Sequence, residues 1–511
     1  MELIVPEILE HRAVDYPDKA AVILGSGCIT YRELNEGSNA LAKYLIRVGI
    51  NKSDRVGILL EKSIEAILSI YAVAKCGGVF VPINQRLTRD QVMYNVKHCS
   101  MKCVITSDRY AAKIHRTKGL HILNTSALQN IIKDPSTSPG GRPARVVETD
   151  LAAILYTSGS TGYPKGVVLN HRNLVSGAHI VARYLENSFT DRIISVLPFS
   201  FDYGLNQILT CHLVGGTLVL QQSMYPKHIC DTLVQERITG FAGVPTIWVQ
   251  LLQRYSPFKR LSFPDLRYIT NSGDTVPLRY LKQLREVLTE TRIYLMYGLT
   301  EAFRSTYLPP EELEKRPTSI GKAIPNVDIH VLNERGKECG PGESGELVHR
   351  GANIFQGYWN DPEATAKVLK PFPFGSEEIP RKEMAVYSGD IVTRDEDGFL
   401  YFIGRKDHLI KSAGFRISSQ EIEDALYQIK GIKEAAVIGI EDDMLGHKIR
   451  AFVSLGDGVK LCEKEVIDFC AERLPNYMVP HMIVFLDNLP RTLNKKIDRV
   501  ALKRGCGHGH G

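Results

Sequence analysis

The N-terminal part of the chain alternates short apolar runs with stretches that are apolar on one side only. Residues 54–60 and 79–84 are apolar runs of the length of a buried strand. Between them, residues 63–78 repeat apolar positions at helical spacing and end in two glycines, which suit a helix C-terminus. Strand, helix and strand in this order predict parallel layers of α/β structure.

The pattern changes near residue 320. Residues 326–351 and 395–417 hold short apolar runs separated by Gly and Pro, which predict a small antiparallel β subdomain with a hairpin turn at Asp397 and Gly398. Residues 418–429 predict a helix with a serine at its N-cap, and two apolar runs and a further helix follow it. The turn-rich residues 125–150 predict a surface connection.

These patterns predict an α/β protein of two domains. Residues 1–405 form, in this prediction, a large N-terminal domain of layered α/β subdomains plus the small antiparallel β subdomain. Residues 406–511 form a small α+β C-terminal domain. The length of 511 residues agrees with this division, since it is too great for a single core.

Charge and composition exclude two classes of partner. The 63 basic and 57 acidic residues give a net charge of +6 without a basic block, so nucleic acid is not an expected partner. No run approaches about 18 apolar residues, so a membrane span is not expected. Residues 1–20 lack a basic n-region and a long apolar h-region, so a signal peptide is not expected either. The ten cysteines include no paired CxxC motifs, which favours reduced thiols and a cytoplasmic location.

Residues 154–167 (ILYTSGSTGYPKGV) pass from an apolar run into a loop rich in glycine and hydroxyl groups. Glycine lets backbone N–H groups approach phosphate oxygens, hydroxyls add donors and Lys165 adds charge, so the loop suits a polyphosphate. A solvated turn is the other interpretation. A Walker A loop is excluded, because glycine follows Lys165 where that motif needs serine or threonine. The residues of this candidate phosphate loop are Thr157, Ser158, Gly159, Ser160, Thr161, Gly162 and Lys165.

The same stretch resembles the first core motif of the adenylate-forming (AMP-binding) superfamily, which comprises acyl- and aryl-CoA ligases, peptide-synthetase adenylation domains and luciferases. Further resemblances follow in the family's order, at residues 297–301 (YGLTE), 345–359 (GELVHRGANIFQGYW), 387–390 (YSGD), 404–423 (GRKDHLIKSAGFRISSQEIE) and 489–499 (LPRTLNKKIDR). The sequence departs from the family pattern at Ser388, where the family has threonine, and at Lys495, where it has glycine. The resemblance covers nearly the whole chain.

The resemblance implies a reaction in two steps. A carboxylate attacks the α-phosphate of ATP to give an acyl adenylate and pyrophosphate, and a pantetheine thiol of coenzyme A or of a carrier protein then takes the acyl group. Lys496 would bridge the carboxylate and the α-phosphate side, with Lys495 as a second cation beside it. Glu301 would hold Mg²⁺, and Thr300 would contact the α-phosphate.

The resemblance also implies residues for the nucleoside and for the thiol acceptor. Asp390, assisted by Arg405, would accept hydrogen bonds from the ribose hydroxyls, and Tyr297 would stack on the adenine ring. Asp407 would be the hinge of a mobile C-terminal domain that rotates between the two steps, and Gly414 would leave room for the pantetheine arm. The remaining implied residues, in a turn against which adenine packs and after Tyr297, are Gly273, Asp274, Thr275 and Gly298.

The identity of the carboxylate stays open between two classes. Phe201 stands where many acyl-CoA ligases have histidine, whereas Phe201 with Asp202 matches amino-acid-activating domains, in which the aspartate pairs with the substrate ammonium. Asp202 can equally cap a helix or bond to backbone. Residues 201–207 and 296–310 also resemble a subgroup of acyl-CoA ligases associated with exosortase systems. Arg304 would either point toward the substrate or brace its loop.

The leading hypothesis is therefore an ATP-dependent acid–thiol ligase that acts on a small-molecule carboxylate. The alternative is a stand-alone enzyme that loads an amino acid onto a carrier protein. A non-catalytic scaffold is disfavoured, because the lysine, glutamate and aspartate of the motifs are all present. A luciferase-like oxygenase has no positive feature in the sequence.

Overall fold

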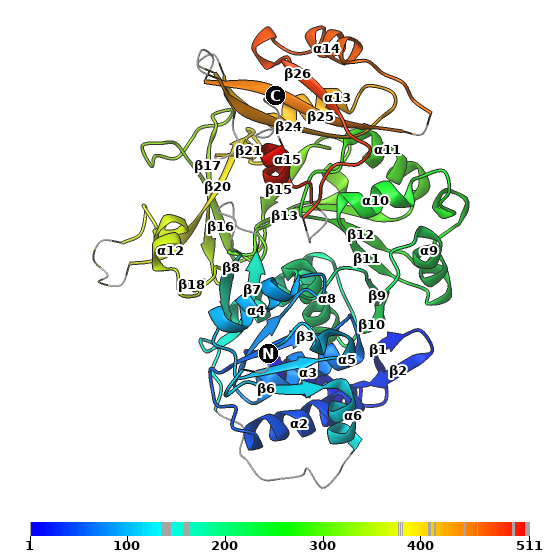
Figure 1. Cartoon of the computed structure of the whole chain (residues 1–511), viewed down its shortest axis with the longest axis vertical. Coiled ribbons are helices and arrows are strands. Elements are labelled where there is room, and N and C mark those ends of the chain that lie inside the picture. Colours follow the sequence, from blue (N-terminus) through cyan, green and yellow to red (C-terminus); the bar gives the residue numbers. More distant parts are fainter. Residues whose placement is uncertain are drawn as a thin grey trace.

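The computed structural model describes residues 2–505, apart from residue 116 and residues 134–144, 158–163, 377, 379, 381, 407–409, 413–414, 443–445, 457 and 493–495. The parts of the chain are stacked along the long axis of the molecule, with the N-terminal part at one end and the C-terminal strands at the other (Figure 1).

A sheet with seven strands in the described residues contains the predicted N-terminal α/β layer. Its order is β18-β8-β7-β4-β3-β5-β6, and β7, β4, β3, β5 and β6 run parallel. The helix predicted within residues 63–78 is α3 (Ile64–Lys75), which Ser63 caps and which Gly77 follows with φ +74°. The strands are β3 (Arg55–Leu59), β4 (Val79–Pro82), β5 (Cys103–Thr106), β6 (His121–Asn124), β7 (Leu151–Thr157), β8 (Lys165–Asn170) and β18 (Gly357–Tyr358), and the other helices of this part are α2 (Tyr31–Arg47), α4 (Arg89–His98), α5 (Asp108–Ala111) and α6 (Thr125–Lys133).

A second sheet has parallel strands at one end. These strands are β1 (Ala20–Leu24), β9 (Arg192–Ser195), β10 (Thr217–Leu220), β11 (Gly240–Gly243), β12 (Tyr268–Asn271) and β13 (Arg292–Tyr297), with β2 (Gly27–Thr30) antiparallel at the edge. The helices of this part are α1 (Val5–Asp15), α7 (His171–Tyr184), α8 (Asp202–Leu213), α9 (Pro226–Gln235), α10 (Pro245–Leu251) and α11 (Leu278–Val287), with 3₁₀ turns at Phe258–Arg260 and Pro310–Glu312. Every residue of α8 is buried, and its apolar residues join a core that contacts strands of both sheets.

Beyond β13 the second sheet becomes antiparallel, which confirms the predicted β subdomain. The strands of this region are β14 (Thr306–Leu308), β15 (Ser319–Ala323), β16 (Val327–Leu332), β17 (Gly345–Gly351), β19 (Leu369–Pro371), β20 (Met384–Arg394) and β21 (Leu400–Arg405), accompanied by α12 (Pro362–Val368). The predicted hairpin turn connects β20 to β21, where Gly398 has φ +84° and the Phe399 carbonyl accepts from the Asp395 N–H at 2.9 Å.

The residues after position 409 pack around a core of their own. This core includes Ile417, Ile422, Leu426 and Val453. The predicted helix is α13 (Ser419–Leu426), whose N-cap Ser418 accepts from the Glu421 N–H at 3.3 Å. The other elements are β22 (Ile410–Ser412), β23 (Phe415–Ile417), β24 (Ile432–Asp442), β25 (Gly446–Leu455), β26 (Met482–Phe485), α14 (Glu463–Ala471), α15 (Arg499–Gly505) and a 3₁₀ turn at Asn476–Met478. The boundary between residues 405 and 406 stays a prediction.

One predicted connection is partly wrong. Residues 125–133, which the sequence assigned to a surface connection, form helix α6, and its apolar side is buried through Leu128 and Ile131. The spacing of these two residues is helical, but the abundance of turn formers after them hid the signal. Among the described residues, no helix combines the length and the apolar character that crossing a membrane requires.

Candidate active site

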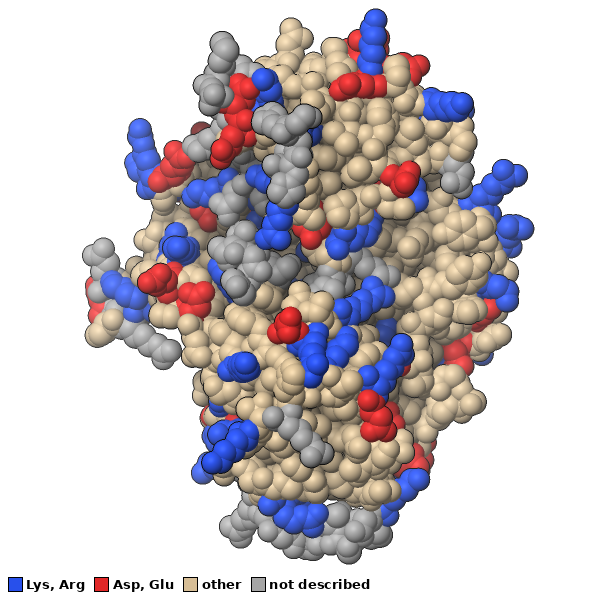
Figure 2. Space-filling model, viewed as in Figure 1, with Lys and Arg blue, Asp and Glu red and all other residues tan. Residues whose placement is uncertain are grey.

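Several predicted site residues, among them Gly273, Tyr297, Asp390 and Lys496, lie where the C-terminal domain meets the second sheet. Lys and Arg side chains gather around the middle of the face shown in Figure 2, at this junction. A cavity of about 570 Å³ lies between the two domains, and Arg86, Lys433, Arg491 and Lys496 are among its lining residues. The junction therefore attracts anionic groups.

Tyr297 and Asp390 come together from different strands. Tyr297 ends β13, and its hydroxyl donates to Asp390 Oδ2 at 2.5 Å. Asp390 pairs with Arg405 across the β20–β21 ladder, and Arg405 Nε lies 3.3 Å from Asp390 Oδ1. Burial raises the pKa of Asp390, and the charges of Arg405 and Lys496 and the Tyr297 hydroxyl oppose that rise. Burial, reinforced by Asp390, also raises the pKa of Tyr297 well above its usual value.

Ser388, where the resemblance led us to expect threonine, keeps the function of the hydroxyl. Its Oγ accepts from the Asp390 N–H at 3.0 Å and donates to the Leu347 carbonyl at 2.7 Å. The hydroxyl thereby fixes the backbone that carries the Asp390 carboxylate. The substitution removes a methyl group and leaves this connection intact.

Lys165 and Glu301 both contact Tyr358. Lys165 begins β8 and pairs with Thr157 at the end of β7, so both residues flank the candidate phosphate loop. The Lys165 ammonium lies 5.0 Å from the centre of the Tyr358 ring. The Tyr358 hydroxyl donates to Glu301 Oε1 at 2.6 Å, and Thr300 lies beside Glu301, half-buried. Tyr358 thus contacts a cation through its ring and a carboxylate through its hydroxyl.

The glycine after Lys165 has a packing role. A Cβ built at Gly166 would lie 2.9 Å from Ile154 Cγ2 and 3.3 Å from Trp359 Cβ, so a side chain does not fit there. This close contact lets β7, β8 and β18 pack tightly around Lys165 and Tyr358. The absence of the Walker A pattern at this position thus has a local explanation.

Lys496 reaches the turn that follows β12. Gly273 in this turn has φ +91°, a conformation that favours glycine. A Cβ built at Gly273 would lie 3.6 Å from Lys496 Cε and 3.7 Å from Phe201 Cζ, so these two side chains border the same small space. Asp274 accepts from the Thr275 N–H at 2.9 Å and so stabilises the turn itself.

Asp202 does not line either of the two cavities described here. It lies in the first turn of α8, and its Oδ2 forms an ion pair with Arg304 Nη1 at 3.0 Å. The side chains of Asp202 and Arg304 are 6% and 3% exposed, and the Arg304 guanidinium lies 4.8 Å from the Tyr203 ring centre. Arg304 therefore braces its loop against α8, one of the two roles that the sequence left open. Gly298 packs on the same loop, since a Cβ there would lie 3.1 Å from Arg304 Cα.

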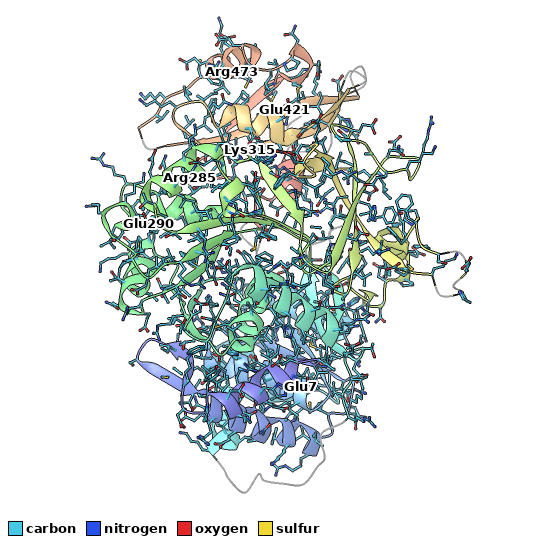
Figure 3. All side chains as sticks on the ribbon, turned by 180° about the vertical axis from the view of Figure 1, so that it is seen from behind. Glu7, Arg285, Glu290, Lys315, Glu421 and Arg473 are labelled. Carbon is cyan, nitrogen blue, oxygen red and sulfur yellow. The ribbon has the colours of Figure 1, made fainter. Side chains whose placement is uncertain are left out.

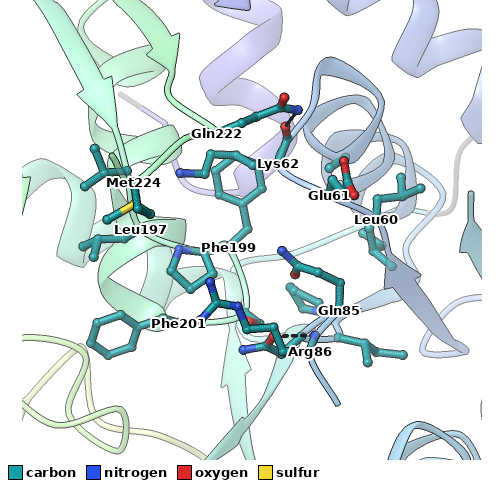
Figure 4. Close-up of a pocket in the computed structure, with 18 of the residues that line it drawn as sticks. Leu60, Glu61, Lys62, Gln85, Arg86, Leu197, Phe199, Phe201, Gln222 and Met224 are labelled. Carbon is teal, nitrogen blue, oxygen red and sulfur yellow. Dashed lines mark hydrogen bonds between the residues drawn. The ribbon is translucent and has the colours of Figure 1, made fainter. Parts of the chain in front are cut away.

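A second cavity of about 270 Å³ adjoins the first and shares Arg86 and Val244 with it. Figure 4 shows Phe201, Leu197 and Met224 on one side of this cavity and Leu60 on the other. The lining is mostly apolar, with polar groups from residues that include Glu61, Lys62, Asn84, Gln85 and Gln222. The Glu61 carboxylate is paired with Arg109 at 2.8 Å. Lys62 donates to the Ser195 and Gln221 carbonyls at 2.8 and 3.0 Å.

Several predicted residues cannot be placed. Ser158, Gly159, Ser160, Thr161, Gly162, Asp407 and Gly414 lie outside the described residues, as does Lys495. Sequence reasoning also missed one contributor, because Tyr358 was read only as part of a family motif. Its position next to a glycine in a short strand gave no signal that its hydroxyl would reach Glu301.

The described residues fit a nucleotide. Asp390 Oδ1 is buried, and although it lies 3.3 Å from Arg405 Nε, it accepts no hydrogen bond from any described group, which leaves an acceptor for a ribose hydroxyl. Lys165 and Lys496 supply positive charge from two sides, and Glu301 is a half-buried carboxylate suited to Mg²⁺.

Comparison with known proteins agrees with this geometry. The family described as AMP-binding enzyme matches residues 9–359, and the family described as AMP-binding enzyme C-terminal domain matches residues 421–496. Tyrocidine synthase 2 of Brevibacillus parabrevis is 32% identical over 510 residues, which are 98% of this chain and 14% of that synthase. The chain thus spans only a small part of the length of this relative.

Two further proteins match over almost their full length. A long-chain-fatty-acid–CoA ligase of Bacillus subtilis (strain 168) is 27% identical over 532 residues, which cover 96% of this chain and 92% of the ligase. The crystal structure of ATP-bound MatB from Rhodopseudomonas palustris is 27% identical and superimposes with a TM-score of 0.88, covering 99% of both chains.

Proposed function

Because the chain belongs to the family of AMP-binding enzymes, we propose that it is an ATP-dependent acid–thiol ligase. It activates a carboxylic acid as an acyl adenylate, releases pyrophosphate and passes the acyl group to a pantetheine thiol. The observation that carries this proposal is the position of Lys496, whose side chain borders the space at Gly273 together with Phe201 and whose charge opposes the rise that burial causes in the pKa of Asp390.

In the first step the chain's cations reduce a repulsion between two anions. The carboxylate of the acid and the α-phosphate of ATP are both negative, so their approach needs positive charge that is already in place. Lys496 supplies it next to Phe201, and Lys165 supplies it on the side of the phosphate loop. Asp390 holds the ribose of the nucleotide, and Tyr297, whose hydroxyl donates to Asp390, stacks on the adenine, which together fix the phosphates relative to Lys496.

Glu301 is the residue that would hold Mg²⁺, and the ion would neutralise part of the negative charge of the phosphates. The Tyr358 hydroxyl orients the Glu301 carboxylate at 2.6 Å. Thr300 stays assigned to the α-phosphate by resemblance. The residues of the phosphate loop, together with Asp407 as a hinge and Gly414 at the pantetheine path, stay assigned by resemblance alone.

We favour an acyl or aryl acid over an amino acid as the substrate. An ammonium substrate needs a carboxylate partner in the pocket. Asp202, the candidate for that role, is buried and already paired with Arg304. The cavity beside Phe201 instead offers a mostly apolar lining, which suits the hydrocarbon part of a carboxylic acid. The resemblance to exosortase-associated ligases stays a prediction.

The test is ATP–pyrophosphate exchange with the purified protein on a panel of aliphatic, aromatic and amino acids, followed by thioester formation with coenzyme A and with a phosphopantetheinyl carrier protein. We expect an aliphatic or aromatic acid to support exchange and Lys496→Ala to slow it by about 100- to 1,000-fold. Lys503→Ala, an exposed lysine of α15, is the matched control and should leave the rate unchanged. Undiminished exchange in Lys496→Ala would contradict the proposal.

One observation favours the second candidate, amino-acid activation for a carrier protein. The relative named above at 32% identity is a tyrocidine synthase, and Phe201 and Asp202 match the amino-acid-activating pattern. If this candidate is right, only amino acids will support exchange, and the acyl group will pass to the carrier protein.

A further inference from the structure

Arg279 of the N-terminal domain is bonded to three backbone carbonyls of the C-terminal domain. It lies in the first turn of α11. Its Nη1 donates to the Tyr427 carbonyl at 3.2 Å, and its Nη2 donates to the Ile432 and Lys433 carbonyls at 2.5 and 3.2 Å. The two domains are therefore joined at this place by one guanidinium.

The chemistry of both partners suits this contact. Tyr427 is the C-cap of α13, and the carbonyls at the end of a helix lack intrahelical donors and carry the negative end of its dipole. The guanidinium supplies the missing donors and an opposite charge. It also lies 4.6 Å from the ring centre of Tyr280 and 5.3 Å from that of Tyr427, so an aromatic ring from each domain borders it.

For its own helix, Arg279 is badly placed. A positive charge in the first turn of a helix faces the positive end of the helix dipole, so a residue there is expected to be acidic or neutral. The first turn of α11 contains no acidic residue that would offset it. A residue that destabilises its own helix is expected to form stabilising contacts elsewhere. The hydrogen bonds of Arg279 to Tyr427 and Ile432 are such contacts, and they lie in the C-terminal domain.

The segment that contains Lys496 is fixed to the same part of the C-terminal domain that Arg279 contacts. Arg491 forms an ion pair with Glu434 in β24, and Arg499 makes two hydrogen bonds of 2.6 and 2.7 Å to Glu423 in α13. These pairs fix both sides of the Lys496 segment to the two elements that contact Arg279. The Thr492 N–H also donates to the Lys496 carbonyl at 2.8 Å.

In the N-terminal domain, Arg279 is close in sequence to the turn that borders Lys496. Gly273, which borders Lys496, lies only six positions before Arg279 in the same segment of the N-terminal domain. Residues 273–280 thus contact the C-terminal domain at two points, once at the reactive lysine and once at α13 and β24. Figure 3 shows helices α11 and α13 from behind, with Arg285 on α11 below Glu421 on α13.

We propose that Arg279 is a positioning residue, which seats the C-terminal domain so that Lys496 lies in the adenylation site. This inference rests on the proposed function, because it assigns Arg279 to the step that uses Lys496. Arg279 does not touch the reacting groups. Its removal should leave the rest of the site intact and misplace Lys496, so the adenylation step should slow while the transfer of an acyl group to a thiol should not.

The experiment compares the two half-reactions in Arg279→Gln and Arg279→Lys. We expect Arg279→Gln to slow ATP–pyrophosphate exchange by about 10- to 100-fold, because a misplacement of about 1 Å has that effect. Thioester formation from a supplied acyl adenylate should keep the wild-type rate. Arg279→Lys keeps the charge without the planar fork of donors, so its exchange rate should lie between those of the wild type and Arg279→Gln.

The matched control is Arg285→Gln on the same helix. Arg285 forms an exposed ion pair with Glu314 inside the N-terminal domain, and its replacement should change neither half-reaction. A measurement independent of activity is hydrogen exchange, which should become faster around residues 427–433 in Arg279→Gln and stay unchanged in Arg285→Gln.

Two results would overturn the proposal. One is a wild-type rate of ATP–pyrophosphate exchange in Arg279→Gln, and the other is an equal loss of rate in adenylation and in thioester formation. If none of the acids tested supports ATP–pyrophosphate exchange by the wild-type protein, the proposed function fails. In that case hydrogen exchange alone decides whether Arg279 joins the two domains.

Discussion

At the scale of single residues, the ion pair between Asp202 and Arg304 bears on whether the pocket binds an amino acid or another carboxylic acid. The sequence placed Asp202 among candidate substrate residues because of its neighbour Phe201. In the folded chain its carboxylate forms an ion pair with the buried guanidinium of Arg304, which lies 102 positions later in the sequence. Such a partner is invisible in a one-dimensional pattern, and only the packing of α8 against residues 298–306 reveals it.

Replacing Asp202 therefore tests stability and substrate choice at once. Asp202→Asn leaves the Arg304 guanidinium buried without a counter-charge, so the free energy of unfolding should fall by about 3–5 kcal/mol. Urea unfolding followed by circular dichroism measures this change. The double variant Asp202→Asn, Arg304→Met removes both charges and should recover most of the loss. Unaltered stability in Asp202→Asn, with loss of exchange for amino acids alone, would favour the ammonium-binding role instead.

At the scale of elements, helix α8 is held unusually close to the loop before it. A Cβ built at Gly204 would lie 2.2 Å from the Pro198 carbonyl oxygen, which a real side chain cannot tolerate. This glycine lets the first turn of α8 sit against residues 197–198, and the same turn carries Phe201 as its N-cap. The position of the Phe201 ring in the site thus depends on the absence of a methyl group three residues away.

Gly204→Ala should push α8 away from this loop. We expect a loss of about 1–3 kcal/mol in the free energy of unfolding from the forced contact. The displacement of Phe201 should also raise KM for the acid more than it lowers kcat. Gly505→Ala at the end of α15 is the control, because a Cβ there meets nothing within 4 Å. Equal stability of Gly204→Ala and the wild type in thermal unfolding would show that α8 can relax.

Elements were predicted better than their contacts. The capped helices α3 and α13 and the β20–β21 turn follow from local signals, namely a serine before an apolar repeat and an Asp-Gly turn. The site residues Tyr297 and Asp390 were found through motif resemblance, but their mutual hydrogen bond was not. Tyr358 and Arg279 act through partners distant in sequence, and no local pattern marks such pairs.

At the scale of the whole molecule, buried histidines make stability depend on pH. Burial lowers the pKa of His171, His212 and His349 to about 4 each. In the unfolded chain these groups titrate near 6.5, so between the two values the unfolded state binds more protons than the folded state. Stability contributed by these histidines is complete above pH 6.5 and is lost as the pH falls toward 4. Asp424, whose pKa burial raises to about 6, titrates in the opposite sense.

A single variant measures how much His171 contributes to this pH dependence of stability. His171 Nδ1 accepts from the Val5 N–H at 3.1 Å, and glutamine can provide the same acceptor without titrating. Between pH 6.5 and 4.5, the free energy of unfolding of His171→Gln should depend on pH less steeply than that of the wild type, by about 1.4 kcal/mol per pH unit. Urea titrations at several pH values measure both slopes. His228→Gln, an exposed position, should keep the wild-type slope.

The pairing of β1 with β10 has a consequence for synthesis on the ribosome. Val22 aligns with Leu218, so β1 can pair with β10 only after the ribosome has made about 200 further residues. At about 5–20 residues per second, this delay lasts about 10–40 s. Throughout it, the nascent hairpin of β1 and β2 exposes an open edge that chaperones can cover. An expression clone that starts after this hairpin would leave β10 with the same uncovered edge and should accumulate in inclusion bodies.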